Sequence, residues 1–168
     1  MERTGVDALL AEREWDAVVL QQGPPALASS QLHLREWATR WAEAIRARGA
    51  TPALYGVWPE GYRRYALPAV IASYRNAARA SGSVLLPAGD GWRVAWRRSP
   101  SLRLYGPDGF HPSTTGTYLA ALTVYAGLTK TSPVGLPRTV EAGSVKVSLT
   151  ARAARTLQLS AAEALARG

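Results

Sequence analysis

The sequence predicts an α/β fold, a three-layer α/β/α sandwich around a parallel sheet. Short apolar runs alternate with longer amphipathic segments, and this order is typical of parallel strands connected by helices. The apolar runs are continuous, which indicates strands buried on both faces. The chain has 168 residues and no repeat, linker or low-complexity tract, so we expect one domain over residues 1–168.

The first half of the chain contains two predicted strands and one long helix. Residues 6–14 have the composition of a helix end, and the apolar run 17–20 predicts the first strand. Residues 30–48 form the clearest helix, which Gly49 ends. The apolar stripe of this helix consists of Leu34, Trp37, Trp41 and Ile45. Residues 51–57 predict the second strand.

The middle of the chain continues the alternation of helix and strand. A helix at residues 66–80, closed by Gly82, leads to a third strand at residues 83–87. Residues 88–91 have the composition of a turn at the carboxyl end of that strand. Residues 92–98 then predict a short helix.

The last part of the chain predicts two more helices. Ser113 or Thr114 can cap a helix that ends near residue 128. The buried stripe of this helix is expected to contain Tyr118, Leu119, Leu122, Tyr125 and Ala126. We expect a loop at residues 130–147 and a C-terminal helix at residues 148–166, where Ala-rich sequence has a helical period.

Composition excludes several kinds of chemistry. There are no cysteines, so disulfides, a thiol nucleophile and cysteine metal sites are excluded. With only two histidines, His33 and His111, we expect no metal site and no other cofactor, and we interpret His33 as structural or solvated. The net charge is +8, but no basic run has the length of a specific nucleic-acid tract.

The sequence also bears on location. No apolar stretch reaches membrane-spanning length, and the first residues lack the apolar core of a signal peptide. As written, the chain is expected in the cytoplasm and away from membranes. A secreted product follows if the true N-terminus lies upstream.

One short motif carries recognisable chemistry. Asp108 stands three residues before His111 in a turn rich in glycine and proline. A carboxylate near an imidazole can fix the tautomer of the ring and stabilise its protonated form, as a general base requires. The alternative is that Asp108 forms the turn and His111 is a surface residue before a capped helix.

Two loops at carboxyl ends of predicted strands can complete a site beside this turn. Ligands of open α/β sheets bind beyond the carboxyl ends of the strands. Gln21, Gln22 and Gly23 follow the first strand, and Trp58 follows the second. We therefore expect these residues to lie near a bound substrate.

The motif and its surroundings resemble those of a known family. The run from Asp108 to Ala121, followed by Ser132-Pro-Val-Gly-Leu136, is similar to the C-terminal catalytic block of the SGNH (GDSL-type) hydrolases. The run from Trp15 to Gln21 is similar to the strand of the third block of that family, so the resemblance covers approximately residues 5–137.

The resemblance has implications for fold and activity. It implies an SGNH/flavodoxin-like fold and hydrolysis of a small acyl ester, for example an acetyl ester of a carbohydrate. His111 would be the general base and Asp108 would orient it. Gly23 and the amides of Gln21 or Gln22 would lie near the oxyanion.

The sequence departs from the family pattern in two ways. No Gly-Asp-Ser-like turn precedes Trp15, and no serine at all occurs before Ser29. The position of the third-block asparagine is occupied by Pro25, which has neither a side-chain donor nor a backbone N–H. Whether the chain is an enzyme therefore stays open at this point.

Three explanations of the missing serine remain. The chain can be a truncated hydrolase without its N-terminal strand or strands, with the nucleophile encoded upstream. Such a truncation would expose the edge at residues 17–20 and favour self-association. It can instead be a degenerate member that binds a carbohydrate or another ligand without cleaving it. Finally, another serine can act, the candidates being Ser29, Ser30 and Ser113.

Two binding functions follow from composition. A carbohydrate-binding module would use the aromatic side chains of Trp58, Tyr62 and Trp92, because aromatic faces suit sugar rings. The positive net charge alone would suit a non-specific binder of nucleic acid or another acidic polymer.

Overall fold

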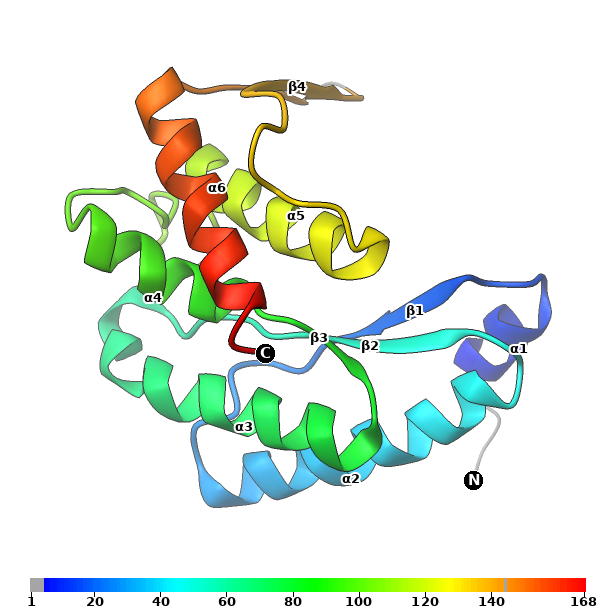
Figure 1. Ribbon diagram of the computed structural model, residues 1–168. Coiled ribbons are helices and arrows are strands. Elements are labelled where there is room, and N and C mark those ends of the chain that lie inside the picture. The colour runs from blue at the N-terminus through cyan, green and yellow to red at the C-terminus, as the bar shows by residue number, and fades with distance from the viewer. Residues whose placement is uncertain (1–4, 144) are drawn as a thin grey trace.

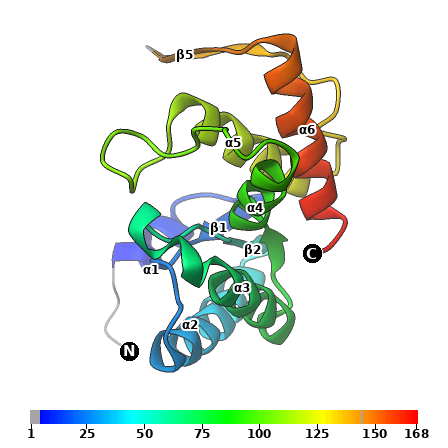
Figure 2. The same ribbon diagram turned by 90° about the vertical axis from the view of Figure 1, so that its left-hand side faces the viewer.

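The computed structural model describes residues 5–143 and 145–168. Its centre is a three-stranded parallel sheet in the order β1-β2-β3 (Figure 1), formed by Ala17–Leu20, Thr51–Tyr55 and Val84–Leu86. Helices α2 (Ala28–Arg46) and α3 (Leu67–Ser81) cover one face of the sheet. Helices α4, α5 and α6 lie on the opposite side (Figure 2). The predicted α/β class with a parallel sheet is confirmed.

The other elements complete these layers. Helix α1 (Gly5–Ala11) precedes β1, and the short 3₁₀-helix η1 (Gly61–Ala66) precedes α3. The helices of the second layer are α4 (Ala88–Arg98), α5 (Thr114–Thr129) and α6 (Ala151–Leu165). Strands β4 (Thr139–Ala142) and β5 (Val145–Ser148) form an antiparallel hairpin between α5 and α6.

The hairpin corrects the prediction of a loop at residues 130–147. Val140 pairs with Val147, whose side chain is buried against the core, and Gly143 has a left-handed φ of 57° in the connecting turn. Each strand has only four residues, so an alternating pattern has little length in which to show itself.

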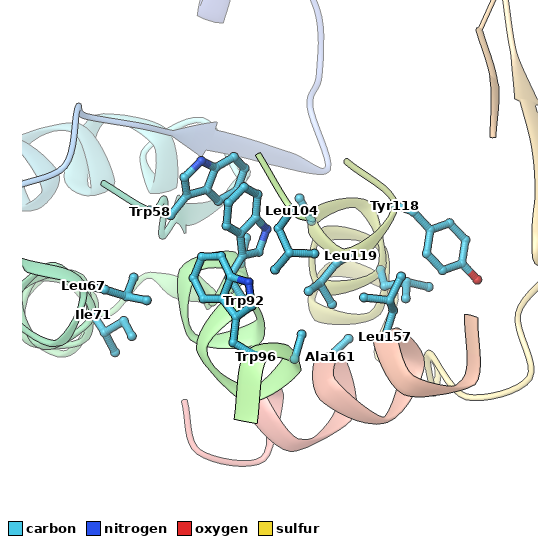
Figure 3. Close-up of a cluster of buried hydrophobic side chains, with 14 of the residues drawn as sticks. Trp58, Leu67, Ile71, Trp92, Trp96, Leu104, Tyr118, Leu119, Leu157 and Ala161 are labelled. Carbon is cyan, nitrogen blue, oxygen red and sulfur yellow. The ribbon is translucent and has the colours of Figure 1, made fainter. Parts of the chain in front are cut away.

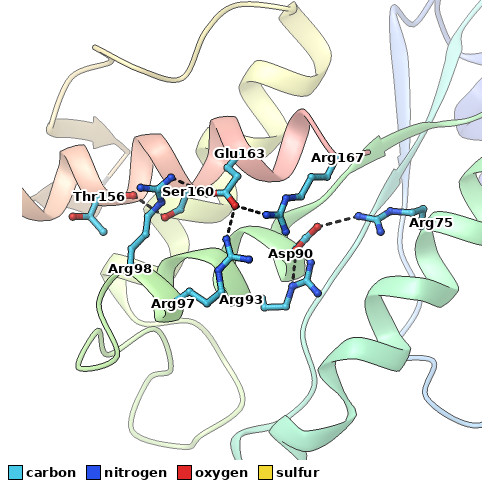
Figure 4. Close-up of polar contacts among 9 residues, drawn as sticks. All are labelled: Arg75, Asp90, Arg93, Arg97, Arg98, Thr156, Ser160, Glu163 and Arg167. Atoms are coloured by element: carbon cyan, nitrogen blue, oxygen red, sulfur yellow. Dashed lines mark hydrogen bonds and ion pairs between the residues drawn. The ribbon is translucent and has the colours of Figure 1, made fainter.

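The predicted turn at residues 88–91 is also wrong, because these residues form the first turn of α4. The N–H of Gly89 donates to a backbone carbonyl just after β2 at 2.7 Å, which needs close approach of the two chains. Asp90, only 2% exposed, pairs with Arg75 at 3.0 Å and with Arg93 at 2.7 Å (Figure 4). The backbone carbonyl after β2 and Arg75 both lie far from residues 88–91 in the sequence. Composition alone therefore predicts a turn here instead of a helix.

A second network of ion pairs connects α6 to α4. Glu163 of α6 accepts hydrogen bonds from Arg97 and Arg98 of α4 and from Arg167 after α6 (Figure 4). The hydrogen bond from Arg97 is the main reason why the pKa of Glu163 lies below its ordinary value. Part of the positive charge of the chain is therefore used to hold two helices together.

The predicted apolar stripes are close to the observed ones. In α2 the buried positions are Leu34, Ala38, Ala42 and Ile45, while the larger Trp37 and Trp41 lie half-buried beside them. In α5 the stripe is buried as expected except for Tyr125, which is 45% exposed. Ser113 caps α5, accepting from the N–H of Gly116 at 3.1 Å.

Stacked indoles form the centre of the main core (Figure 3). The rings of Trp58 and Trp92 stack with centroids 3.8 Å apart, and Trp96 and Tyr105 meet Trp92 edge-on. Trp92 is fully buried and Trp58 is 7% exposed. This aromatic cluster gives the loop after β2 and the segment after α4 a common rigid backing.

Strand β1 lies at an edge of the sheet. Val19, in the middle of this strand, is 43% exposed, and an edge strand presents unpaired main-chain donors and acceptors. Within the sheet, β1 therefore has an unpaired edge, while the truncation and self-association through this edge stay predictions.

Candidate functional site

The turn at residues 105–112 is closed by its own backbone hydrogen bonds. The N–H of Gly106 donates to the carbonyl of His111 at 2.8 Å, and Tyr105 and Pro112 form an isolated antiparallel bridge. Gly109 has a φ of 67°, a conformation in which a side chain is strained. The ends of the turn thus meet, and its side chains project from a compact loop.

Asp108 and His111 are in direct contact within this turn. One carboxylate oxygen of Asp108 accepts from the backbone N–H groups of Phe110 and His111, both at 3.0 Å. The other oxygen lies 2.6 Å from Nδ1 of His111. The predicted acid–histidine pair is thus formed, and the two backbone bonds hold the carboxylate in the position that the pair requires.

The electrostatics of the pair favour an ionised carboxylate. The hydrogen bond with His111 is the main cause that lowers the pKa of Asp108, followed by the N–H of Phe110. With Nδ1 donating to Asp108, the Nε2 atom keeps its lone pair and can accept a proton. The side chain of Asp108 is 49% exposed and that of His111 is 73% exposed, so Nε2 of His111 can reach a substrate or another protein group.

The loop after β2 holds the turn in place through three hydrogen bonds. The hydroxyl of Tyr105 donates to the carbonyl of Pro59 at 2.6 Å, and the N–H of Gly61 donates to Gly109 at 2.7 Å. The indole Nε1 of Trp58 donates to the carbonyl of Phe110 at 3.3 Å. Trp58 therefore connects the stacked core to the residue directly before His111.

A hollow of about 290 Å³ opens beside His111 at the carboxyl ends of β1 and β2. Four of the residues predicted from sequence line it together, namely Gln21, Gly23, Trp58 and His111. The remaining walls are apolar or aromatic and consist of Pro24, Tyr55, Val57, Phe110 and Pro112. The arrangement suits a small, largely apolar group held next to a base.

Gln22 lies outside this hollow. Its side-chain amide donates to the carbonyl of Ser30 at 3.0 Å, and its backbone N–H donates to the hydroxyl of Tyr74, also at 3.0 Å. The Tyr74 hydroxyl in turn donates to the carbonyl of Gln22 at 2.5 Å. Both amide donors of Gln22 are thus engaged, which leaves Gln21 as the glutamine whose side chain lines the hollow.

Tyr74 lies within the predicted helix at residues 66–80, and the sequence predicts no part for it in the site. Tyr74 is 1% exposed, and burial raises its pKa to about 12. Its partner is 52 residues away, so no local pattern could show that this side chain supports the loop after β1.

No serine or threonine of residues 5–143 and 145–168 lines this hollow. Ser113 donates to the carbonyl of Arg103 at 2.7 Å while it caps α5, and Ser30 donates to the carbonyl of Leu27 at 2.8 Å. Ser29 is exposed at the start of α2 and is not part of the lining. None of the three candidate serines therefore lines the hollow with His111.

The aromatic residues predicted for a binding module separate in the structure. Trp92 is fully buried, so the prediction that it contacts a ligand is wrong: it packs between Trp58 and Trp96 instead. Trp58 lines the hollow beside His111. Tyr62 is 80% exposed on η1.

His33 is exposed on α2, with its ring centroid 6.0 Å from that of Trp37. Among the described residues, no group of three or more histidine, aspartate and glutamate side chains could hold a metal ion. Within the same part of the chain, no helix is both long and apolar enough to cross a membrane.

Comparisons with known proteins give structural matches alone. No family model matches the sequence, and no curated protein matches it. A DUF4886 family protein from Bacteroides uniformis has a similar solved structure, with a TM-score of 0.74 at 20% identity over 96% of this chain. A candidate SGNH hydrolase from Slackia heliotrinireducens matches with a TM-score of 0.62 at 29% identity over 75% of this chain.

The sheet, its covering helices and these two structures define an SGNH-hydrolase-like fold. The predicted resemblance to that family is confirmed at the level of the fold. This chain spans 66% of the length of the first of these proteins and 73% of the second.

Proposed function

We propose that this chain carries the acid–histidine half of an SGNH-type ester hydrolase that acts on small acyl esters. The observation that supports the proposal is the 2.6 Å contact between Asp108 and Nδ1 of His111 at the wall of the hollow that Gln21 and Gly23 also line. This contact leaves Nε2 as a base directed away from the carboxylate.

The reaction would follow the acyl-serine route. Nε2 of His111 takes the proton of a serine hydroxyl while the serine oxygen bonds to the ester carbonyl carbon. Asp108 stabilises the resulting imidazolium, which then gives its proton to the departing alcohol. Water hydrolyses the acyl-serine with His111 again as base. Gln21 and the backbone N–H of Gly23 are the donors available to the oxyanion.

We further propose that the serine lies on a segment outside these 168 residues that adds to the edge of β1. Two observations support this assignment. Strand β1 is an edge strand with Val19 exposed, and the His111 side chain is 73% exposed, which is unusually open for a base in a working site. A segment along this edge could cover both.

The volume and the walls of the hollow support a small acyl group. Its volume of about 290 Å³ and its aromatic walls leave room for a short acyl group beside His111. The alcohol part of the ester would lie on the open side of the turn.

Labelling with a fluorophosphonate probe, followed by peptide mass spectrometry, tests the proposal. The samples are the 168-residue chain and the product of the complete gene, including any sequence encoded upstream of Met1. We expect an adduct on an upstream serine in the longer product alone. His111→Ala should slow labelling by about 10²–10⁴-fold, whereas the matched control His33→Ala should not.

Two results would contradict parts of the proposal. A His111-dependent adduct on a serine within the 168 residues would keep the hydrolase but overturn the assigned origin of the nucleophile. Absence of an adduct in both folded proteins would overturn the hydrolase and favour the ligand-binding module, because no described residue of the hollow is a serine or threonine.

A further inference from the structure

A second, larger hollow lies on the other side of the Asp108–His111 turn. Its volume is about 820 Å³, and Pro112 lines both this hollow and the smaller one. Its walls come from η1, from α4 with the segment that follows it, and from the start of α5. Arg64, Trp96 and Arg103 are among the side chains that line it.

Two arginines bring uncompensated positive charge into this hollow. The guanidinium of Arg64 lies over the ring of Trp96, with Cζ 3.7 Å from the centroid, and Arg103, in the segment after α4, is exposed and also lines the hollow. Neither guanidinium makes an ion pair with a carboxylate of the described part of the chain. The acid of the adjoining turn, Asp108, is engaged with His111.

The guanidinium of Arg64 is positioned in advance by its contact with Trp96. The indole of Trp96 is itself fixed, because its Nε1 donates to the carbonyl of Leu102 at 3.0 Å. A guanidinium stacked on a fixed ring loses little freedom when it binds, and its planar fork matches a carboxylate in two parallel hydrogen bonds. By contrast, the neighbouring Arg63 is already paired with Glu60 at 3.2 Å.

Exposed aromatic rings flank Arg64 in the same short helix. Tyr62 and Tyr65 are 80% and 81% exposed on η1, outside the lining of the hollow itself. Their ring faces can pack on the C–H faces of sugars while their hydroxyls remain in water. Helix η1 and the segment after α4 lie on the same side of the molecule, at the left of Figure 1.

We propose that this hollow binds a segment of an acidic polysaccharide whose sugars carry carboxylates. Arg64 and Arg103 bind the carboxylates inside the hollow, and Tyr62 and Tyr65 stack on sugars of the same chain that extend beyond it along η1. The inference rests on the proposed ester hydrolysis, because the bound chain would present its ester to His111 across Pro112. Charge and ring faces together favour this ligand over nucleic acid, which would require a longer series of phosphate contacts.

Isothermal titration calorimetry with oligogalacturonates tests this inference, and neutral cello-oligosaccharides of equal length serve as the reference ligand. Arg64→Ala and Arg103→Ala should each weaken oligogalacturonate binding about tenfold, the loss of a charge-assisted contact. Arg152→Ala is the matched control, because it removes one exposed positive charge from α6 and should change the affinity less than about twofold. Arg64→Lys keeps the charge but not the planar fork, so it should bind with intermediate affinity.

Several outcomes would overturn the inference. These are absence of oligogalacturonate binding, an equal loss in Arg152→Ala, or tighter binding of a single-stranded oligonucleotide that depends on the same arginines. Circular dichroism melts identify any variant that fails to fold, and each arginine is tested separately. Binding needs no nucleophile, so a negative result here leaves fluorophosphonate labelling intact, and a failure of labelling leaves this binding measurable.

Discussion

Tyr74 provides the sharpest prediction about how the fold supports the site. Its hydroxyl bonds to both the carbonyl and the N–H of Gln22, at 2.5 and 3.0 Å, in the loop that lines the hollow. Tyr74→Phe leaves two backbone groups without partners, each worth about 1–3 kcal/mol when buried. Gln22 is half-buried, so water can satisfy part of this loss. We expect the variant to lose about 2 kcal/mol of unfolding free energy in total.

The pKa of Tyr74 adds a pH dependence of known sign. Burial raises this pKa from 10.0 to about 12, which favours the protonated phenol in the folded state. Ionisation of Tyr74 therefore leaves the free energy of unfolding unchanged below pH 10 and lowers it by about 3 kcal/mol in total as the pH rises through 12. Tyr74→Phe should remove this part of the alkaline loss, while the part due to Tyr105, whose pKa burial also raises to about 12, remains.

Urea unfolding at neutral pH and across the alkaline range measures both effects. Tyr62→Phe is the control, since Tyr62 is 80% exposed and should change stability by less than about 0.5 kcal/mol. A Tyr74→Phe protein that is as stable as the wild type at neutral pH would show that the loop after β1 is held by other contacts.

Three other predictions follow from single features. Gly116→Ala places a Cβ 2.2 Å from a backbone carbonyl oxygen and should lower the free energy of unfolding, measured in urea, by about 1–3 kcal/mol or more. Gly127→Ala in the same helix places a Cβ 2.6 Å from a leucine methyl group, which can move, so it should cost less. Equal losses in the two variants would contradict this prediction. The lowered pKa of Asp108 contributes stability at pH values above its ordinary pKa of 3.8, and this stability is lost as the pH falls through the pKa of the folded state. Asp108→Asn should therefore make the free energy of unfolding less dependent on pH in the acid range. An unchanged dependence would argue against the pair with His111. Val19→Lys should abolish concentration-dependent self-association in analytical ultracentrifugation, and a dimer that survives this change must use another surface.

The regular elements were predictable where the pattern is long or strongly apolar. The run at 17–20 and the helix after Ser113 were found because burial on both faces and helix capping leave local signals. The hairpin was missed because its strands are four residues long. The first turn of α4 was missed because Gly89 and Asp90 belong to a helix only through contacts with distant segments.

In the candidate site, too, contacts between residues close in the sequence were predictable and contacts between distant residues were not. Asp108 and His111 are three residues apart, so a tight turn brings them together and the sequence alone could predict their contact. That Gln21 lines the hollow while Gln22 turns away depends on Tyr74, and this could not be read from two adjacent glutamines. Composition likewise could not tell that Trp92 is buried and that Tyr65 is exposed, because both types of residue occur in either place.

The tautomer of His111 tests the central claim most directly, because the account requires Asp108 to hold Nδ1 protonated and to leave Nε2 as a base. Nitrogen NMR of the imidazole rings measures this at a pH where His111 is neutral, and with only two histidines in the chain the spectrum is simple to assign. The account predicts that His111 carries its proton on Nδ1 and that Asp108→Asn removes this preference, while His33 is unaffected. A His111 that carries its proton on Nε2 in the wild-type protein, unchanged in Asp108→Asn, would contradict the account.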